Sequence, residues 1–124
     1  MTEEETCLYL TRVRDAKRDI ALLEADYRWA CDGIERLKRI QIHGKLAASI
    51  ANTKRFTVKR DALLRFREEA AARIERLPDV RFREILKGRY LEGDTWEWIA
   101  SWMGYDTRHV HRLHKRALAA MAQE

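Results

Sequence analysis

A heptad pattern near the N-terminus is the feature that most limits what this chain can fold into. Between Tyr9 and Leu37, apolar or small residues recur at alternating spacings of four and three. A seam of this kind, held for about four heptads, predicts one long helix whose apolar side packs against a second helix. The seam residues are Tyr9, Val13, Ala16, Ile20, Leu23, Tyr27, Ala30, Ile34 and Leu37. Because tyrosines and alanines make the seam irregular, an antiparallel helix of the same chain is at least as good a partner as a second copy.

A second helical seam runs from Val58 to Leu77 and stops at Pro78, because proline disfavours helical geometry in the residue before it. Residues 41–57 break the heptads and contain glycine, serine, asparagine and threonine, which is typical of a connector that could include a short helical turn or two. The simplest arrangement is a coiled-coil-like helical hairpin over residues 1–77, used for assembly or partner contact. Such helices could also join copies of the chain into a homo-oligomer.

Composition favours helices in the rest of the chain as well. The 124 residues include one proline and five glycines, and Ala, Leu, Arg, Lys, Glu and Ile predominate. We therefore expect an all-α protein, either one ordinary domain or a small domain with a helical extension.

Neither a membrane span nor a secretion signal is visible in the sequence. No run of about 18 apolar residues occurs, and the first residues lack the basic region of a signal peptide. If Cys7 and Cys31 lie on one helix, roughly 36 Å of axial rise separates them, whereas bridged Cα atoms lie within about 7 Å. We therefore expect no intrachain disulfide, no membrane partner and a cytoplasmic protein.

Three short helices are expected after Pro78, in a domain that spans residues 78–124. The first ends near Gly93 and the second at a turn near Gly104, since glycine adopts turn geometry easily. The last runs to about residue 121. The expected N-terminal caps are Asp79, then Asp94 or Thr95 with Glu97 completing a capping box, then Asp106 or Thr107.

The last two of these helices carry the spacing of a helix-turn-helix. Ala100 is a small residue where two helices cross, Gly104 supplies the turn, and Val110 locks the second helix on the first. The expected framework of this domain is Trp96, Ile99, Ala100, Met103, Gly104, Tyr105, Val110 and Leu113. We therefore predict a C-terminal three-helix domain of the helix-turn-helix type behind the N-terminal hairpin.

The other side of the second helix predicts a surface that reads DNA. Residues 107–123 contain four Lys and Arg residues and no acid, which favours a polyanionic partner. Side chains early in the helix would meet base edges of double-stranded DNA, and later ones would meet phosphates. The predicted base-reading residues are Thr107, Arg108, His109, His111 and Arg112, and the predicted phosphate contacts are His114, Lys115 and Arg116. A basic face that is merely solvated is the alternative.

The same stretch of the sequence also contains histidines and tryptophans. His111 and His114 could share one helix face, but no cysteine or acid accompanies them there, so we expect neither a metal site nor a cofactor. Trp98 and Trp102 are four residues apart, on the side of their helix away from the predicted reading helix. Large apolar side chains there predict a partner surface for another protomer, RNA polymerase or the chain's own hairpin.

These residues also resemble a known group of proteins. The motifs "RYLEG", "TW-x-x-IA" and "MGY-x-x-R-x-V-x-R-L", within residues 80–121, resemble the C-terminal helix-turn-helix of the ArpU/RinA-like late-gene regulators of phages and prophages, many of them uncharacterised. That group in turn looks like region four of bacterial sigma factors. The resemblance implies that Arg108, His109, His111 and Arg112 lie in the DNA-reading helix. The chain departs from the pattern at Trp98 and Trp102, where polar residues would be expected.

The function expected from the sequence is a sequence-specific DNA-binding regulator of phage or prophage transcription, in the cytoplasm of a bacterial host and on the nucleoid when bound to DNA. One alternative is a packaging protein similar to a small terminase subunit, which also joins a helix-turn-helix to oligomerising helices. Another is a helical protein-interaction module without DNA binding. An enzyme is not expected, because the sequence has no glycine-rich phosphate loop and no nucleophile with a placed base.

Overall fold

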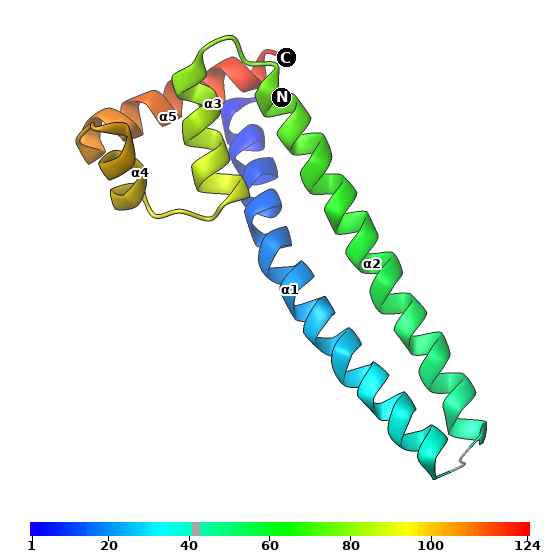
Figure 1. Ribbon diagram of the computed structural model, residues 1–124. Helices are drawn as coiled ribbons and strands as arrows, with labels where there is room; N and C mark the ends of the chain where they lie inside the picture. Colours follow the sequence, from blue (N-terminus) through cyan, green and yellow to red (C-terminus); the bar gives the residue numbers. More distant parts are fainter. Residues whose placement is uncertain (41–42) are drawn as a thin grey trace. The chain divides into compact units, whose positions relative to one another are not determined.

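The computed structural model describes residues 1–40 and 43–124, and this part of the chain folds into helices without a β-strand (Figure 1). The prediction of an all-α protein is confirmed, and the whole heptad seam lies in the long first helix. The helices are α1 (Glu3–Arg39), α2 (His43–Glu75), α3 (Val80–Leu86), the π-helix η1 (Lys87–Leu91), α4 (Trp96–Met103) and α5 (Thr107–Ala122).

The chain divides into two compact units, each of which contains part of both long helices. The terminal unit consists of Met1–Lys17 and Phe66–Glu124, and the middle unit is Arg18–Arg65. This division differs from the predicted boundary at residue 78, because the two ends of the chain share one core. Leu10 of α1 and Ile74 of α2 are fully buried in the same cluster as the C-terminal helices.

The core of the terminal unit gathers apolar side chains from every helix of that unit. Ile85, Ile99 and Leu113 each expose at most 1% of their surface. Burial of this extent is the main source of stability for short helices, which are marginal alone. The cluster consists of Leu10, Ile74, Leu77, Phe82, Ile85, Leu86, Tyr90, Ile99, Ala100, Val110, Leu113, Ala117, Leu118 and Met121.

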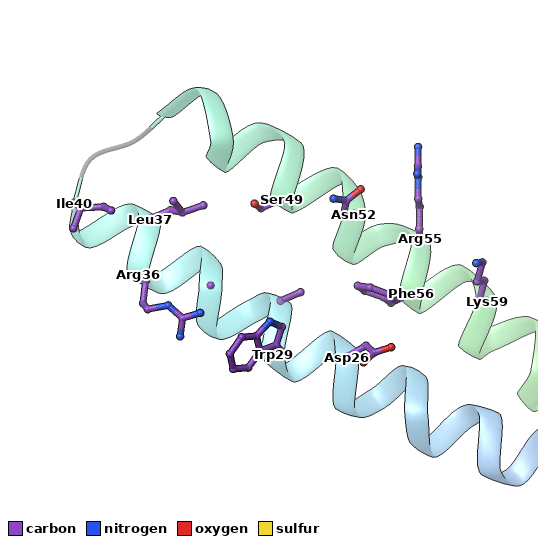
Figure 2. Close-up of a pocket in the computed structure, with 12 residues that line it drawn as sticks. Asp26, Trp29, Arg36, Leu37, Ile40, Ser49, Asn52, Arg55, Phe56 and Lys59 are labelled. Carbon is purple, nitrogen blue, oxygen red and sulfur yellow. The ribbon is translucent and has the colours of Figure 1, made fainter.

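Within the middle unit, the segments of α1 and α2 lie side by side, as Figure 2 shows for the end near Ile40. Among residues 18–40 and 45–65, the buried side chains are Ile20, Ile34 and Thr53, and the other α1 seam residues of this unit are half-buried. A helix that packs against a single partner helix can bury only part of its apolar stripe. The middle unit therefore keeps much of its apolar surface in contact with solvent.

The predicted connector over residues 41–57 is wrong for its described part, because α2 begins at His43. Residues 41 and 42 lie outside the described residues. The inward positions keep their heptad spacing through this segment, but several of them hold polar residues such as Ser49 and Thr53, so the apolar pattern breaks while the helix continues. Alanines and Leu46 favour helix here, and the Thr53 hydroxyl donates to the Ile50 carbonyl at 2.7 Å within α2.

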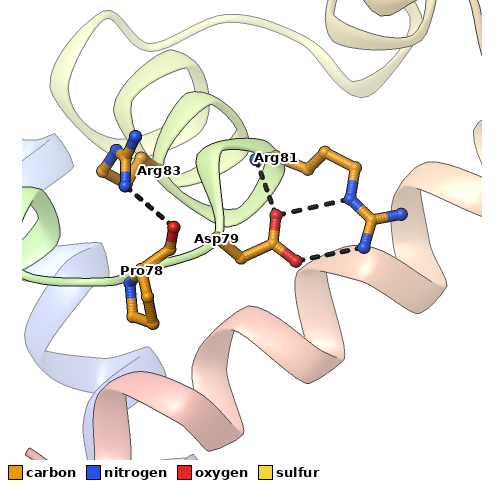
Figure 3. A network of polar contacts seen from close by, with 4 residues as sticks. All are labelled: Pro78, Asp79, Arg81 and Arg83. Carbon is orange, nitrogen blue, oxygen red and sulfur yellow. Dashed lines mark hydrogen bonds and ion pairs between the residues drawn. The ribbon is translucent and has the colours of Figure 1, made fainter.

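The start of α3 is fixed by a small polar network after Pro78 (Figure 3). Asp79 is the N-cap, as predicted, and its carboxylate accepts the Arg81 backbone N–H at 2.9 Å. The Arg81 guanidinium also donates to this carboxylate at 3.0 Å, and the side-chain hydrogen bond holds the pKa of Asp79 below its usual value. Arg83 donates to the Pro78 carbonyl at 3.2 Å. The turn between α2 and α3 is thus held from both sides.

Both cysteines lie on α1 and are free thiols, as the helical spacing predicted. Among the helices of residues 1–40 and 43–124, none is long and apolar enough to cross a bilayer.

Candidate nucleic-acid interface

Helices α4 and α5 are joined by a turn whose ends are both capped. Thr95, rather than Asp94, is the N-cap of α4, and its hydroxyl accepts the Trp98 backbone N–H at 3.2 Å. Gly104 ends α4 with a φ of 74°, in the left-handed region that glycine adopts without strain. Asp106 then caps α5 by accepting the His109 backbone N–H at 2.8 Å. Gly104 and Asp106 therefore set where α5 starts relative to α4.

The inner sides of α4 and α5 pack together over the core of the terminal unit. Ile99 and Val110 are fully buried, and Ala100 and Leu113 expose at most 5%. The rest of the predicted framework lies at the edge of this core, since Trp96, Met103 and Tyr105 are partly buried against it and Gly104 is exposed.

The outer side of α5 is a continuous basic surface. Its exposed residues are Thr107, Arg108, His111, Arg112, Lys115 and Arg116, and the helix contains no acid. Among the described residues, none of these arginines or this lysine belongs to an ion pair. The Arg116 guanidinium lies 5.5 Å from the Phe82 ring centre, so its side chain extends toward α3. The charge on this face is available to a polyanion.

His109 lies at the edge of this surface. It is half-buried, with its ring edge-on to Tyr105 at 4.5 Å between centres. Arg112 lies close, with a guanidinium nitrogen 3.5 Å from the His109 Nδ1. The exposed His111 packs on Trp96 at 4.8 Å between ring centres. Of the five predicted base-reading residues, His109 is thus the least accessible.

The prediction that His114 faces outward as a phosphate contact is wrong. Its Nε2 lies 2.6 Å from the Tyr90 hydroxyl, and its ring packs on Trp96 at 4.6 Å between centres. Burial lowers the pKa of His114 to about 4, helped by the charges of His111 and Arg89. His114 is therefore neutral at pH 7 and has no charge to offer a phosphate.

Helical geometry explains why His114 turns inward. Residues 110, 113, 114 and 117 follow the i, i+3, i+4, i+7 spacing of one buried stripe, which is wider than the three apolar positions alone suggest. Position 114 therefore borders the core, where the imidazole Nε2 is hydrogen-bonded to the Tyr90 hydroxyl.

Tyr90 is a residue whose role the sequence did not reveal. Its side chain is 3% exposed, and burial raises the pKa of its hydroxyl. Besides His114, the hydroxyl approaches the Cys7 sulfur at 4.0 Å, so three distant segments meet at one atom. The sequence places an aromatic residue at position 90, in the first helix expected after Pro78. No neighbouring residue indicates that its hydroxyl forms a hydrogen bond with a residue 24 positions away.

Trp98 and Trp102 form an aromatic patch on the other side of α4. Trp98 is 60% exposed and Trp102 is 42% exposed. Trp102 lies over Gly88 of η1, since a Cβ added to that glycine would stand 3.1 Å from the Trp102 ring. Part of Trp102 therefore packs within the terminal unit, whereas Trp98 remains largely open to solvent.

Comparisons of the chain with known protein families, with curated proteins and with solved structures found no match. In the described part of the chain, no three His, Cys, Asp or Glu side chains gather as a metal ion would require.

Proposed function

We propose that α4 and α5 form a helix-turn-helix that binds double-stranded DNA, and that the protein is a sequence-specific regulator of phage or prophage transcription. The observation that carries this proposal is the exposed, acid-free face of α5, which includes the first two residues of the helix, Thr107 and Arg108. A helix of this kind can enter the major groove, where base edges differ for each base pair.

The frame around α5 supports the same proposal. Ala100 is small and buried on α4, Gly104 takes the positive φ of the turn, and Val110 is fully buried on α5. A helix-turn-helix needs each of these features so that its second helix projects from a fixed support.

Arg108, His111 and Arg112 are the proposed base-reading residues, with Thr107 at the helix start. Arginine matches the two acceptors of guanine with paired donors, so these side chains suit direct readout. Lys115 and Arg116 are nearer the end of α5 and are proposed to contact phosphates. His114 has no part in the interface, because it is hydrogen-bonded to Tyr90.

One observation favours a second candidate function. The 60% exposure of Trp98 is unusual for so large an apolar side chain and is typical of protein-interaction surfaces. The chain would then be a helical interaction module, or a regulator that contacts a protein such as RNA polymerase through this patch.

Selection of bound sites from random duplex DNA tests the proposal. The full chain should enrich a shared motif and bind it about a thousandfold or more tightly than a shuffled duplex. Affinity should fall steeply between about 50 and 200 mM salt, because phosphate contacts release counterions. Failure to enrich any motif, with no measurable duplex affinity at low salt, would instead support the interaction module.

A further inference from the structure

The middle unit contains an open groove of about 820 Å³ between its two helices (Figure 2). Trp29 and Leu37 of α1, Ile40 just after its end and Phe56 of α2 supply most of its apolar lining. Trp29 is 71% exposed and Ile40 is 63% exposed, so two large apolar side chains of the groove face solvent. Exposed apolar surface of this size is a common mark of a binding site.

The shape of the groove fits a third helix. Its lining comes from two helices that lie side by side, and positions 26, 29, 30, 33, 36 and 37 of α1 repeat at helical spacing along it. An amphipathic helix placed there would complete a three-helix bundle and cover the open side of the seam. Gly33 lies within this row and leaves room for close approach of another backbone.

The charges around the groove indicate which kind of helix would bind. Arg36, Arg55 and Lys59 line it, and Asp26 is the acid among the described lining residues. Arg55 and Lys59 extend from α2 away from α1, whereas Phe56 points toward α1 (Figure 2). The Arg36 guanidinium lies 5.3 Å from the Trp29 ring centre, so a cation already stands beside the main aromatic anchor. A partner with carboxylates flanking an apolar stripe would complement this pattern.

A second copy of the chain complements the groove poorly. The α2 segment of the middle unit, residues 43–65, contains six Lys and Arg residues and one acid. The α1 segment, residues 18–39, contains five basic and five acidic residues. Neither helix of another middle unit would bring the surplus of negative charge that the rim favours.

We propose that the groove of the middle unit is a docking site for an acidic amphipathic helix of a different protein. Trp29 and Phe56 bind its apolar side chains, and Arg55 and Lys59 bind carboxylates along its edge. This site is separate from α5 and does not depend on DNA binding by the terminal unit.

A displayed library of helical peptides tests this proposal on the full-length chain. The peptides are about 20 residues long, which spans about 30 Å as a helix, with apolar residues fixed at seam positions and the outer positions randomised. Selection against the protein should enrich sequences rich in Asp and Glu. One enriched peptide, fluorescently labelled, then serves as the probe for binding measurements.

Variants locate the probe on the protein. Trp29→Ala should weaken binding about thirtyfold, as truncation of a central aromatic anchor does. The double charge reversal Arg55→Glu with Lys59→Glu should weaken it about tenfold. The matched control reverses Lys45 and Arg65, which are exposed on α2 and do not line the groove, and should change affinity less than threefold. Circular dichroism of each variant checks that the helices remain folded.

Several results would overturn the proposal. Enrichment of neutral or basic peptides, or no enrichment at all, would contradict the acidic partner. Equal loss in the two double reversals would show a general charge effect. A dimer seen by sedimentation and broken by Trp29→Ala would assign the groove to a second copy, and single-stranded nucleic acid held there would assign it to a different ligand. Replacing Arg108 and Arg112 with Ala should leave peptide binding unchanged, which separates this test from that of DNA binding.

Discussion

The terminal and middle units use the same two long helices in different ways. In the terminal unit, α1 and α2 share one buried core with four further helical segments, and residues such as Leu10 and Ile74 are fully buried. In the middle unit, the same helices have only each other, and Leu22, Trp29 and Val58 each expose more than half of their surface. A heptad seam therefore predicts that a helix has a partner, but the number of helices around it decides how much becomes core.

The comparison predicts very different costs for similar truncations. Leu113→Ala in the terminal unit should lower the free energy of unfolding by about 2–5 kcal/mol, because the side chain is 1% exposed and leaves a cavity. Leu22→Ala in the middle unit should change it by less than about 0.5 kcal/mol, because that leucine is 57% exposed. Urea unfolding of both variants measures the difference, and similar losses would contradict the division into a packed and an open unit.

A second prediction concerns acid and the terminal unit. The folded-state pKa of His114 is lowered to about 4 from 6.5, so the unfolded chain binds its proton first as pH falls. The stability from keeping His114 neutral is therefore complete above about pH 6.5 and is lost progressively toward pH 4. The loss should be on the order of 2 kcal/mol.

His114→Gln keeps a polar side chain near Tyr90 and removes this titration. Unfolding measured at several pH values should show a shallower fall below pH 6.5 in the variant than in the natural chain. Parallel curves would mean that the imidazole is not held neutral in the folded protein.

The third and smallest effect compares one glycine from each unit. Gly104 has a φ of 74°, so Gly104→Ala should destabilise the protein by about 1–2 kcal/mol. Gly33 lies inside α1, and a Cβ there would meet its nearest atom at an ordinary 3.7 Å. Gly33→Ala should therefore stabilise the protein by about 0.5–1 kcal/mol. Thermal unfolding should show a lower melting temperature for Gly104→Ala and a higher one for Gly33→Ala. Shifts in the same direction for the two variants would contradict the left-handed backbone at Gly104 or the helical backbone at Gly33.

The sequence predicted those helices and caps that depend on interactions between residues close together in the chain. The seam from Tyr9 to Leu37 predicted α1, and short polar residues predicted the caps at Asp79 and Asp106. Each of these features depends on residues within a few positions of one another. The segment 43–57 was misjudged because a break in the apolar pattern was taken for a break in the helix.

Features that depend on distant contacts could not be read from the sequence. The inward position of residue 114 follows from helical spacing, but its hydrogen bond at 2.6 Å to Tyr90 joins two helices and has no local signal. The short π-helix Lys87–Leu91 places Gly88 beneath Trp102, and no local pattern announces either. The groove of the middle unit also depends on how two helices lie together. The sequence contains Trp29 and the cations that line the groove, but it does not show that they lie around one groove. DNA binding and the resemblance to phage regulators stay predictions.

The most direct test of the central claim is the affinity of two double variants for the selected duplex. Arg108→Ala with Arg112→Ala should weaken binding at least about thirtyfold, since each base contact contributes about 1–3 kcal/mol. The control, Arg12→Ala with Arg76→Ala, removes the same charge from exposed positions elsewhere in the terminal unit and should stay within about threefold of the natural chain. Equal affinities for the two double variants would contradict the assignment of DNA binding to the outer face of α5.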